Sequence, residues 1–498
     1  MKINIPSPTP RELILVADPK AELRVREGKV ISIADGVDVA PLRDLLNSEE
    51  AVIRPLYGVS EEWLQYRTSF TETLMGVGQR LDLSIFYKVT CPDDKLNLVA
   101  DKLRELSIVQ SAYVKPGVEL AIMDNSIEFL DGISPGTPTG DFTARQVYLN
   151  AASEGGIGVG CAWEREGGLG KGVNIIDVEG AWRFSHEDLI ENQGGLIGGI
   201  SSSELGWRNH GTAVMGVIGG DRNSFGVTGI CPEAMVRAVS VFGESSGAPT
   251  PNWSAAAAIR LAADGLCKGD IILIEHHLPG PPNFEKRDDQ DGYIPIEWWP
   301  CNLAAIQYAT SRGIIVVEAA GNGQRDLDNR VLFDRNPSEP FPPWWVNPFR
   351  RDPIDSNAIL VGAGIPPMRV FGGSDELDRS RLRESNFGSI VDVQSWGDSV
   401  VSCGYGGLSP NDPDEDRWYT SRFNGTSSAA AIVAGVVGCL QGVLRANGDI
   451  LEPLRARRLL RDDSLNSPQQ DGPFGTASGA HIGPRPDLCS LIDHLYPH

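Results

Sequence analysis

The chain has 498 residues, of which 41% are hydrophobic, so it can bury a sizeable core and is long enough for two or three domains. Its 66 acidic residues outnumber its 44 lysines and arginines, and the net charge of −22 argues against nucleic acid or a membrane as a partner. Prolines at positions 6, 8 and 10 stand where a signal peptide has its apolar stretch. We therefore expect a soluble protein, cytoplasmic as synthesised, with non-standard secretion left open.

Residues 1–80 carry few signals. After a proline-rich start, the pattern over 12–33 alternates enough for two short strands, and 58–78 predicts one helix broken by glycine. We assign no function to this region.

A small α+β unit is predicted for residues 81–128. Two strands and an amphipathic helix between them are expected over 81–90, 93–106 and 112–115. Residues 129–140, which follow, are rich in glycine and proline and are typical of a linker. The remainder, 141–498, is then the largest domain.

Short apolar runs alternate with helical stretches throughout residues 141–498. The apolar runs lie at 173–177, 236–241, 271–275, 314–318 and 358–362. The helical stretches lie at 211–217, 254–266, 303–312 and 427–445. This rhythm predicts an α/β fold, a doubly wound parallel sheet with helices on both faces, which binds ligands at the carboxyl ends of its strands.

Three segments of this domain carry the residue types of a nucleophilic site, in the order Asp177, His210 and Ser427. A serine hydroxyl is a weak nucleophile at neutral pH, so an imidazole has to take its proton as it attacks. The imidazole needs a buried carboxylate to fix its tautomer, and Asp177 ends an apolar run expected to be a buried strand. The order acid, base, nucleophile along the chain is one of the orders in which such triads occur.

Two further features complete the predicted site. The residues after Ser427 are small and apolar on nearly every side, as in a buried helix. Ser427 then lies in the first turn of that helix. There the free backbone N–H groups favour negative charge. Asn322 follows another apolar run and offers an uncharged amide donor at a strand's carboxyl end. Together with the Ser427 N–H, this amide is expected to stabilise the oxyanion, a donor being worth roughly 3 to 4 kcal/mol.

These blocks resemble those of the subtilases, the subtilisin-like serine peptidases. The matching segments are Ile176-Asp177 with His186 to Leu189, Asn209 to Thr212, Gly226 to Pro232, Ala319 to Asn322, and Gly425 to Ala429. The resemblance covers about residues 141–498 and implies a serine endopeptidase that cleaves polypeptides through an acyl-enzyme.

The resemblance also bears on the rest of the chain. The unit at 81–128 is similar to a subtilase pro-domain, which implies a self-processing zymogen whose N-terminal domain is an intramolecular inhibitor, clipped between about residues 120 and 145. An ordinary accessory domain is the alternative. No cofactor is required for the chemistry, and structural calcium has family precedent, although no loop matches it ligand by ligand.

The sequence departs from the family pattern at the acid. Asp177-Val178-Glu179 stands where the family usually has Asp-Ser-Gly or Asp-Thr-Gly, so a hydroxyl beside the acid is missing and a second carboxyl is present. We expect the charge of Glu179 to raise the pKa of His210 and to move the activity optimum to the alkaline side.

A second departure concerns the edge that pairs with substrate, where Ile274 to Pro281 includes a proline that cannot donate a ladder hydrogen bond. Substrate pairing there is expected to be shorter than usual or to use only carbonyls. The segment 282–300 is expected to rim the specificity pocket. The substrate-binding candidates are His277, Leu278, Pro279, Gly280, Ala320 and Gly321.

Other interpretations of these residues are weaker. His276 and His277 could suggest a metal site, but adjacent strand residues face opposite ways and no third ligand follows. Gly132 to Gly136 has the letters of a lipase elbow, G-x-S-x-G, without the strand-to-helix turn that an elbow needs. A subtilase-fold binding or scaffolding protein is the alternative function. The eight cysteines form no CxxC pair, and we expect buried free thiols rather than disulfides.

Overall fold

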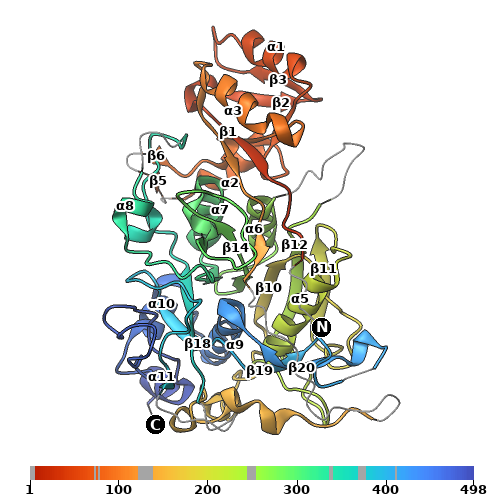
Figure 1. Cartoon of the computed structure of the whole chain (residues 1–498), viewed down its shortest axis with the longest axis vertical. Coiled ribbons are helices and arrows are strands. Elements are labelled where there is room, and N and C mark those ends of the chain that lie inside the picture. Colours follow the sequence, from red (N-terminus) through yellow and green to blue (C-terminus); the bar gives the residue numbers. More distant parts are fainter. Residues whose placement is uncertain are drawn as a thin grey trace.

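The protein folds as an N-terminal domain at one end of its long axis and a larger domain that forms the rest (Figure 1). The computed structural model describes residues 6–71, 74–76, 79–121, 138–243, 254–335, 340–367, 377–409 and 412–497. Most of the predicted linker at 129–140, including the G-x-S-x-G letters, therefore lies outside the described residues.

The N-terminal domain is built on an antiparallel sheet of order β4-β7-β1-β8. Its strands are β1 (Glu12–Ala17), β4 (Val52–Pro55), β7 (Phe86–Thr90) and β8 (Val109–Lys115). Strand β1 is buried along its whole length because it lies between β7 and β8. The sheet joins strands from both sides of the predicted boundary at residue 80, so the stretch before it belongs to the same unit as 81–120.

Helices cover this sheet. They are α1 (Ala40–Ser48), α2 (Glu61–Thr68) and α3 (Leu96–Arg104), and the short strands β2 (Leu23–Arg26), β3 (Lys29–Ser32), β5 (Leu74–Gly76) and β6 (Gln79–Arg80) make two hairpins. Helix α3 is amphipathic as predicted, with Leu96, Val99 and Leu103 buried at helical spacing.

A buried charge sits inside this domain. Glu12 on β1 lies 3.0 Å from the Lys88 ammonium and 2.7 Å from that of Lys115, and all three residues are buried. Burial raises the pKa of Glu12, but the two ammonium groups together outweigh it, so the net pKa lies below its ordinary value.

The larger domain contains a seven-stranded parallel sheet of order β11-β12-β10-β13-β16-β17-β18. The strands are β10 (Asn174–Glu179), β11 (Gln193–Gly198), β12 (Met235–Ser240), β13 (Ile271–Ile274), β16 (Ile315–Ala319), β17 (Ile359–Gly364) and β18 (Val393–Trp396). The five predicted apolar runs match β10, β12, β13, β16 and β17. The edge strands β11 and β18 were not predicted.

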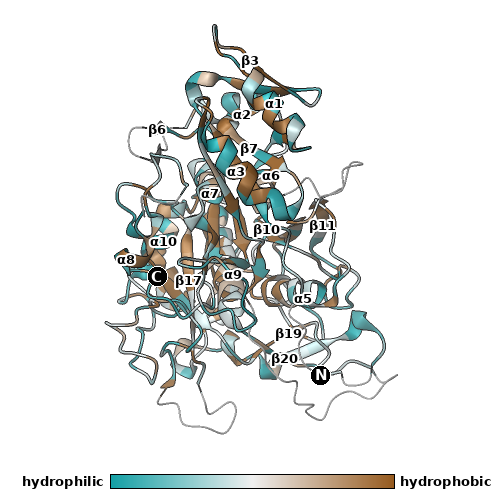
Figure 2. Cartoon of the chain, turned by 45° about the horizontal axis from the view of Figure 1, so that its top comes forward, coloured by the Kyte–Doolittle hydropathy of each residue, from teal (hydrophilic) through white to brown (hydrophobic). Residues whose placement is uncertain are grey.

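Helices lie on both faces of this sheet, as predicted. They are α5 (Leu205–Gly219), α6 (Ala255–Asp264), α7 (Pro300–Ser311) and α9 (Gly425–Ala446). Ile175 packs in the apolar cluster that contains α5 and α9, whereas Ile176 packs in the cluster that contains α6 and α7. Since strand residues alternate, Asp177 and Glu179 point to the same side as Ile175, toward α5 and α9. Figure 2 shows these hydrophobic strands at the centre of the molecule.

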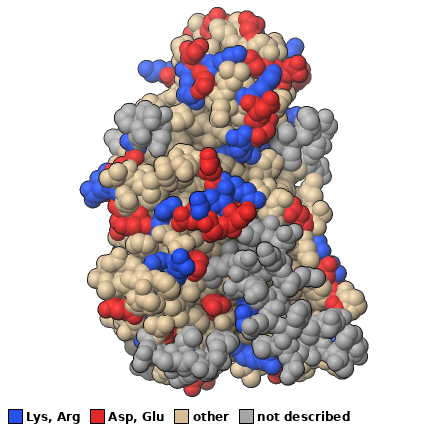
Figure 3. Space-filling view, viewed as in Figure 1, with Lys and Arg blue, Asp and Glu red and all other residues tan. Residues whose placement is uncertain are grey.

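Helix α9 is long and apolar enough to cross a membrane by length and composition, yet that apolar stretch is wholly buried inside the protein. It is the central core helix predicted from the small residues after Ser427. On the described surface seen in Figure 3, basic and acidic side chains are intermixed.

Shorter elements complete the larger domain. The strands are β14 (His276–Pro279), β15 (Tyr293–Pro295), β19 (Val400–Cys403) and β20 (Tyr419–Phe423). The helices are α4 (Val159–Trp163), α8 (Arg330–Phe333), α10 (Pro453–Arg461) and α11 (Leu488–Leu495).

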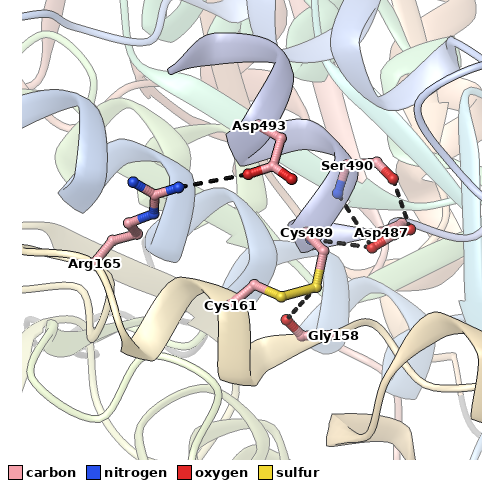
Figure 4. The surroundings of a disulfide bond; sticks show 7 residues. All are labelled: Gly158, Cys161, Arg165, Asp487, Cys489, Ser490 and Asp493. Carbon is pink, nitrogen blue, oxygen red and sulfur yellow. Dashed lines mark hydrogen bonds and ion pairs between the residues drawn. A yellow bond between two sulfur atoms is a disulfide. The ribbon is translucent and has the colours of Figure 1, made fainter. Parts of the chain in front are cut away.

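A disulfide joins Cys161 on α4 to Cys489 on α11, across 328 residues of sequence (Figure 4). Beside it, Arg165 pairs with Asp493, and Asp487 caps α11 by accepting from the Cys489 N–H. The other six cysteines are free and five of them are buried. The prediction of free thiols is therefore wrong for this one pair, whose partners lie too far apart in sequence to be matched by spacing.

Candidate active site

The candidate base and the carboxyls near it come from neighbouring elements. His210 lies on α5 and is fully buried, and its Nδ1 is 3.1 Å from Oε1 of Glu179 at the end of β10. Asp177, two residues earlier on the same strand, accepts a hydrogen bond from the Trp182 indole at 2.7 Å. Glu179 is thus the carboxyl nearest to Nδ1, although neither atom has a hydrogen-bond partner among the described residues, and the charge of Asp177 also acts on the imidazole.

The closer approach of Glu179 has a simple physical basis. Both carboxyls project from the same face of β10, but Glu179 lies nearer the strand's carboxyl end and carries one more methylene. Asp177 is instead engaged by the ring of Trp182, in the loop that follows β10. Asp177 remains close enough to raise the pKa of His210 through its charge, so it is part of the surroundings of the base.

A third carboxyl joins this group. Glu275 follows β13, which pairs with β10, and its side chain faces the Ser427 hydroxyl. Burial raises the pKa of Asp177, Glu179 and Glu275 well above their ordinary values, and mutual repulsion adds to the shift for Asp177 and Glu275. Burial and repulsion therefore disfavour the simultaneous ionisation of all three carboxyls.

Burial also governs the imidazole, since it lowers the pKa of His210 to about 3. The sequence-based expectation that Glu179 would raise this pKa is wrong for this structure. The removal of water from the imidazole outweighs the attraction of nearby carboxyls, which themselves resist ionisation.

The candidate nucleophile lies where the helix starts. Ser427 is in the first turn of α9, and its Oγ donates to the backbone oxygen of Glu275 at 3.2 Å. Among the described residues, Nε2 of the buried His210 has no hydrogen-bond partner. The serine and imidazole both lie in this buried centre without being hydrogen-bonded to each other.

The candidate oxyanion donor is held in a fixed orientation. The Asn322 Oδ1 accepts from both the backbone N–H and the hydroxyl of Thr426, at 3.0 and 2.9 Å. This fixes the amide so that its Nδ2, buried and without a partner among the described residues, points away from Thr426. A free, oriented N–H₂ is what stabilisation of a developing oxyanion requires.

The end of the N-terminal domain lies in this site. Strand β9 (Glu119–Leu120) pairs antiparallel with β14, with Leu120 opposite His276 and Glu119 opposite His277. The next residue, Ala121, is fully buried and its N–H donates to the Glu275 backbone oxygen at 3.4 Å.

The carbonyl oxygen of Ala121 lies beside the oxyanion donor. A β-carbon built on Gly425 would lie 2.3 Å from this oxygen and 3.0 Å from Asn322 Nδ2. The Ala121 oxygen and the Asn322 amide therefore both lie close to Gly425 at the start of α9, and Gly425 has a φ of +84°. Only glycine leaves room for that carbonyl.

The substrate-binding candidates divide into three groups. His277 borders the tail and its Nδ1 accepts from the Asn322 N–H at 3.2 Å. Leu278 and Pro279 pair with β15 on the other edge of β14. The remaining three shape the turns nearby, where Gly280 donates to Gly292, Ala320 donates to Val361, and Gly321 donates to the Thr426 hydroxyl.

The structure brings to the tail four residues that are not among the individual substrate-binding candidates: Glu275, His276, Gln290 and Tyr293. Glu275 and His276 fall in the segment 274–281 predicted to pair with substrate. Gln290 and Tyr293 fall in the segment 282–300 predicted to rim the specificity pocket, so the region was indicated while the individual residues were not. Within the described part of the chain, no group of three or more His, Cys, Asp or Glu side chains is arranged to hold a metal ion.

Comparison with known proteins gives a consistent result. Residues 198–477 match the model of the subtilase family of peptidases, more than half of the chain. Thermitase of Thermoactinomyces vulgaris is 27% identical over 299 residues, covering 58% of this chain and 81% of thermitase. Subtilisin E of Bacillus subtilis (strain 168) is 23% identical over 283 residues, covering 56% of this chain and 58% of that protein.

A solved structure shares the fold. Fervidolysin from Fervidobacterium pennivorans, described as a keratinolytic enzyme related to subtilisin, aligns with a TM-score of 0.52 at 16% identity. The alignment covers 98% of this chain and 61% of fervidolysin.

Proposed function

Because this chain belongs to the subtilase family and is a subtilisin-like serine peptidase, we propose that it cleaves polypeptides with Ser427 as nucleophile, His210 as base and Glu179 as the orienting acid. The observation that carries the proposal is the tail of the N-terminal domain. It lies as an extended strand with the Ala121 carbonyl beside the free amide of Asn322.

The proposed reaction begins with a rotation. The Ser427 hydroxyl leaves the Glu275 carbonyl oxygen, turns to His210 Nε2 and attacks the scissile carbonyl as its proton passes to the imidazole. Glu179 stabilises the imidazolium that forms, and Asn322 with the Ser427 N–H stabilises the oxyanion. His210 then returns the proton to the leaving amine, and water clears the acyl-enzyme.

We further infer that the protein is made as a zymogen that cleaves itself after Ala121. The carbonyl of Ala121 occupies the place that the scissile carbonyl of any substrate would take. This position falls at the start of the interval, 120 to 145, expected from the sequence.

The N-terminal domain is suited to inhibit the site after that cut. Its first residues hold the chain just before the tail, since Thr9 donates to the Val118 oxygen at 3.1 Å and its hydroxyl accepts from the Val118 N–H at 2.9 Å. The same segment reaches helix α5, where Trp207 donates to the Ser7 oxygen. Aromatic contacts such as Tyr113 stacked on Trp299 add apolar area to the interface.

The test uses Ser427→Ala beside the wild-type chain. Wild type is expected to yield two fragments separated after Ala121 and to be labelled at Ser427 by a fluorophosphonate, which reacts only with an activated serine. Ser427→Ala is expected to stay full length and unlabelled. Intact mass spectrometry locates the cut, and identical migration of the two proteins would overturn self-processing. A wild-type chain that takes no label would overturn the peptidase mechanism.

A further inference from the structure

The bound tail shows how the site receives a side chain. We propose that this peptidase selects substrates with glutamate at the third residue before the cut, recognised by the hydroxyl of Tyr293. The inference rests on the proposed function, because it takes Glu119, Leu120 and Ala121 as the substrate residues that precede the scissile bond.

The register of the tail fixes which residue is third. Leu120 lies opposite His276 and Glu119 opposite His277, and the carbonyl of Ala121 lies beside Asn322. The cut therefore follows Ala121, and Glu119 occupies the third position. A one-residue slip would turn every side chain of the strand to the opposite face, so the position of Glu119 is well defined.

Tyr293 is a directed donor at this position. Its hydroxyl lies 2.7 Å from Glu119 Oε1 and accepts the Arg287 backbone N–H at 3.2 Å. Because that N–H takes one lone pair of the phenol oxygen, the phenol proton is free to point at the carboxyl. The ring is fully buried and lies 4.6 Å, centre to centre, from the ring of His277, which holds it in place.

The surroundings of Glu119 form an enclosed site. Glu119 is only 2% exposed, and its Oε2 has no partner among the described residues. Gln290 donates to the Leu120 carbonyl at 2.8 Å, and this bond helps to hold the strand that carries Glu119 in place. Among the described residues, Tyr293 is the side-chain donor to this buried carboxyl, so loss of its hydrogen bond would leave the carboxyl unsatisfied and would disfavour binding.

Charges near the site are mixed. Lys286 favours the ionised form of Glu119, whereas Asp288 and burial oppose it, and burial raises the pKa of this carboxyl overall. The site therefore recognises the carboxyl group of Glu119 mainly through the hydrogen bond that its oxygen accepts from Tyr293, and less through its negative charge. An amide of the same length is expected to be accepted less well than glutamate, and an apolar side chain least well.

The experiment compares the cleavage of three peptides by the wild-type protein, produced as the full chain and allowed to process itself. Each carries the sequence Val-X-Leu-Ala before a fluorogenic leaving group, with X as glutamate, glutamine or leucine. The expected kcat/KM is about 10-fold higher for glutamate than for leucine, with glutamine between them. A leucine peptide cut as fast as the glutamate peptide would overturn the inference and leave the proposed function intact. Failure to cut any peptide, together with no fluorophosphonate labelling, would overturn the proposed function itself.

A variant identifies the recognising group. Tyr293→Phe is expected to reduce the glutamate-to-leucine ratio of kcat/KM about 10-fold, because the donor to the carboxyl is removed while the ring remains. Tyr308→Phe is the matched control, since its buried hydroxyl binds Asp264 on α6 instead. A ratio unchanged by Tyr293→Phe, or changed equally by Tyr308→Phe, would overturn the role of Tyr293.

Discussion

The two domains bury charged groups in opposite ways. In the N-terminal domain, Glu12 lies between two lysines, and its pKa is below the ordinary value. In the catalytic centre, Asp177, Glu179 and Glu275 cluster around one imidazole, and each carboxyl pKa is raised well above the ordinary value. The first arrangement sets its carboxylate against two opposite charges, whereas the second groups three carboxyls whose side chains retain oxygens without hydrogen-bond partners among the described residues.

This difference separates a structural charge from a functional one. A buried carboxylate that is paired with cations resists protonation and holds strands together. A buried carboxyl without a cation is poised to exchange protons with a neighbour, and strongly perturbed pKa values of this kind gather at active sites. The same residue type thus supports stability in one sheet and chemistry in the other.

The largest expected effect tests which carboxyl serves the base. Glu179→Gln keeps the shape but cannot hold the charged imidazole, so we expect the self-cleavage rate to fall by roughly 10⁴-fold. Asp177→Asn is the control, with a loss of about 10-fold, since its main contact is with Trp182. Time courses of fragment formation measure both, and a greater loss for Asp177→Asn would return the orienting role to that residue.

The second prediction concerns the paired charge. In a Ser427→Ala background, Glu12→Gln leaves two buried ammonium groups without their anion and is expected to destabilise the N-terminal domain by about 3 to 5 kcal/mol. Because the pKa of Glu12 is lowered, this effect is present above its ordinary pKa of 4.5 and disappears as the pH falls through the lowered value.

Urea unfolding at pH 7.5 and at pH 3 measures this effect. Glu62→Gln is the matched control, since its side chain is 53% exposed beside Arg24 and its loss is expected to change stability by less than about 1 kcal/mol. Equal effects of the two variants at pH 7.5 would contradict the view that Glu12 is a structural charge.

The smallest expected effect is a gain in the free energy of unfolding, and it comes from a carboxyl of the catalytic centre. The folded state holds the pKa of Glu275 above its ordinary value of 4.5, so this carboxyl lowers stability increasingly as the pH rises above that value. In the Ser427→Ala background, Glu275→Gln is expected to raise the free energy of unfolding at pH 7.5 by on the order of 1 kcal/mol, with little change at pH 4. Urea unfolding at both values tests it, and a loss of stability at pH 7.5 would contradict it.

The sequence was sufficient for the architecture of the larger domain. Its five apolar runs, its helices and the position of Ser427 at a helix start follow from local patterns that the buried sheet imposes. The edge strand β11 is half exposed and rich in glycine, so it lacks the apolar run that identified the others.

The finer features depend on distances that no local pattern encodes. The choice between Asp177 and Glu179 is decided by where the His210 imidazole ends up, and the pairing of Cys161 with Cys489 by the meeting of two remote helices. The four-stranded N-terminal sheet was divided at residue 80 because its strands are far apart in sequence. In each case tertiary packing supplies the missing information.

The disulfide between Cys161 and Cys489 determines which fragments would separate after a cut in the chain. Cys161 and Cys489 both belong to the catalytic domain, while Cys91 in the N-terminal domain is a free thiol. A nick anywhere between the two bridged cysteines would leave the fragments joined until a reducing agent is added. The proposed cut after Ala121 lies outside that covalent ring, so the N-terminal domain that it would release could leave by simple dissociation.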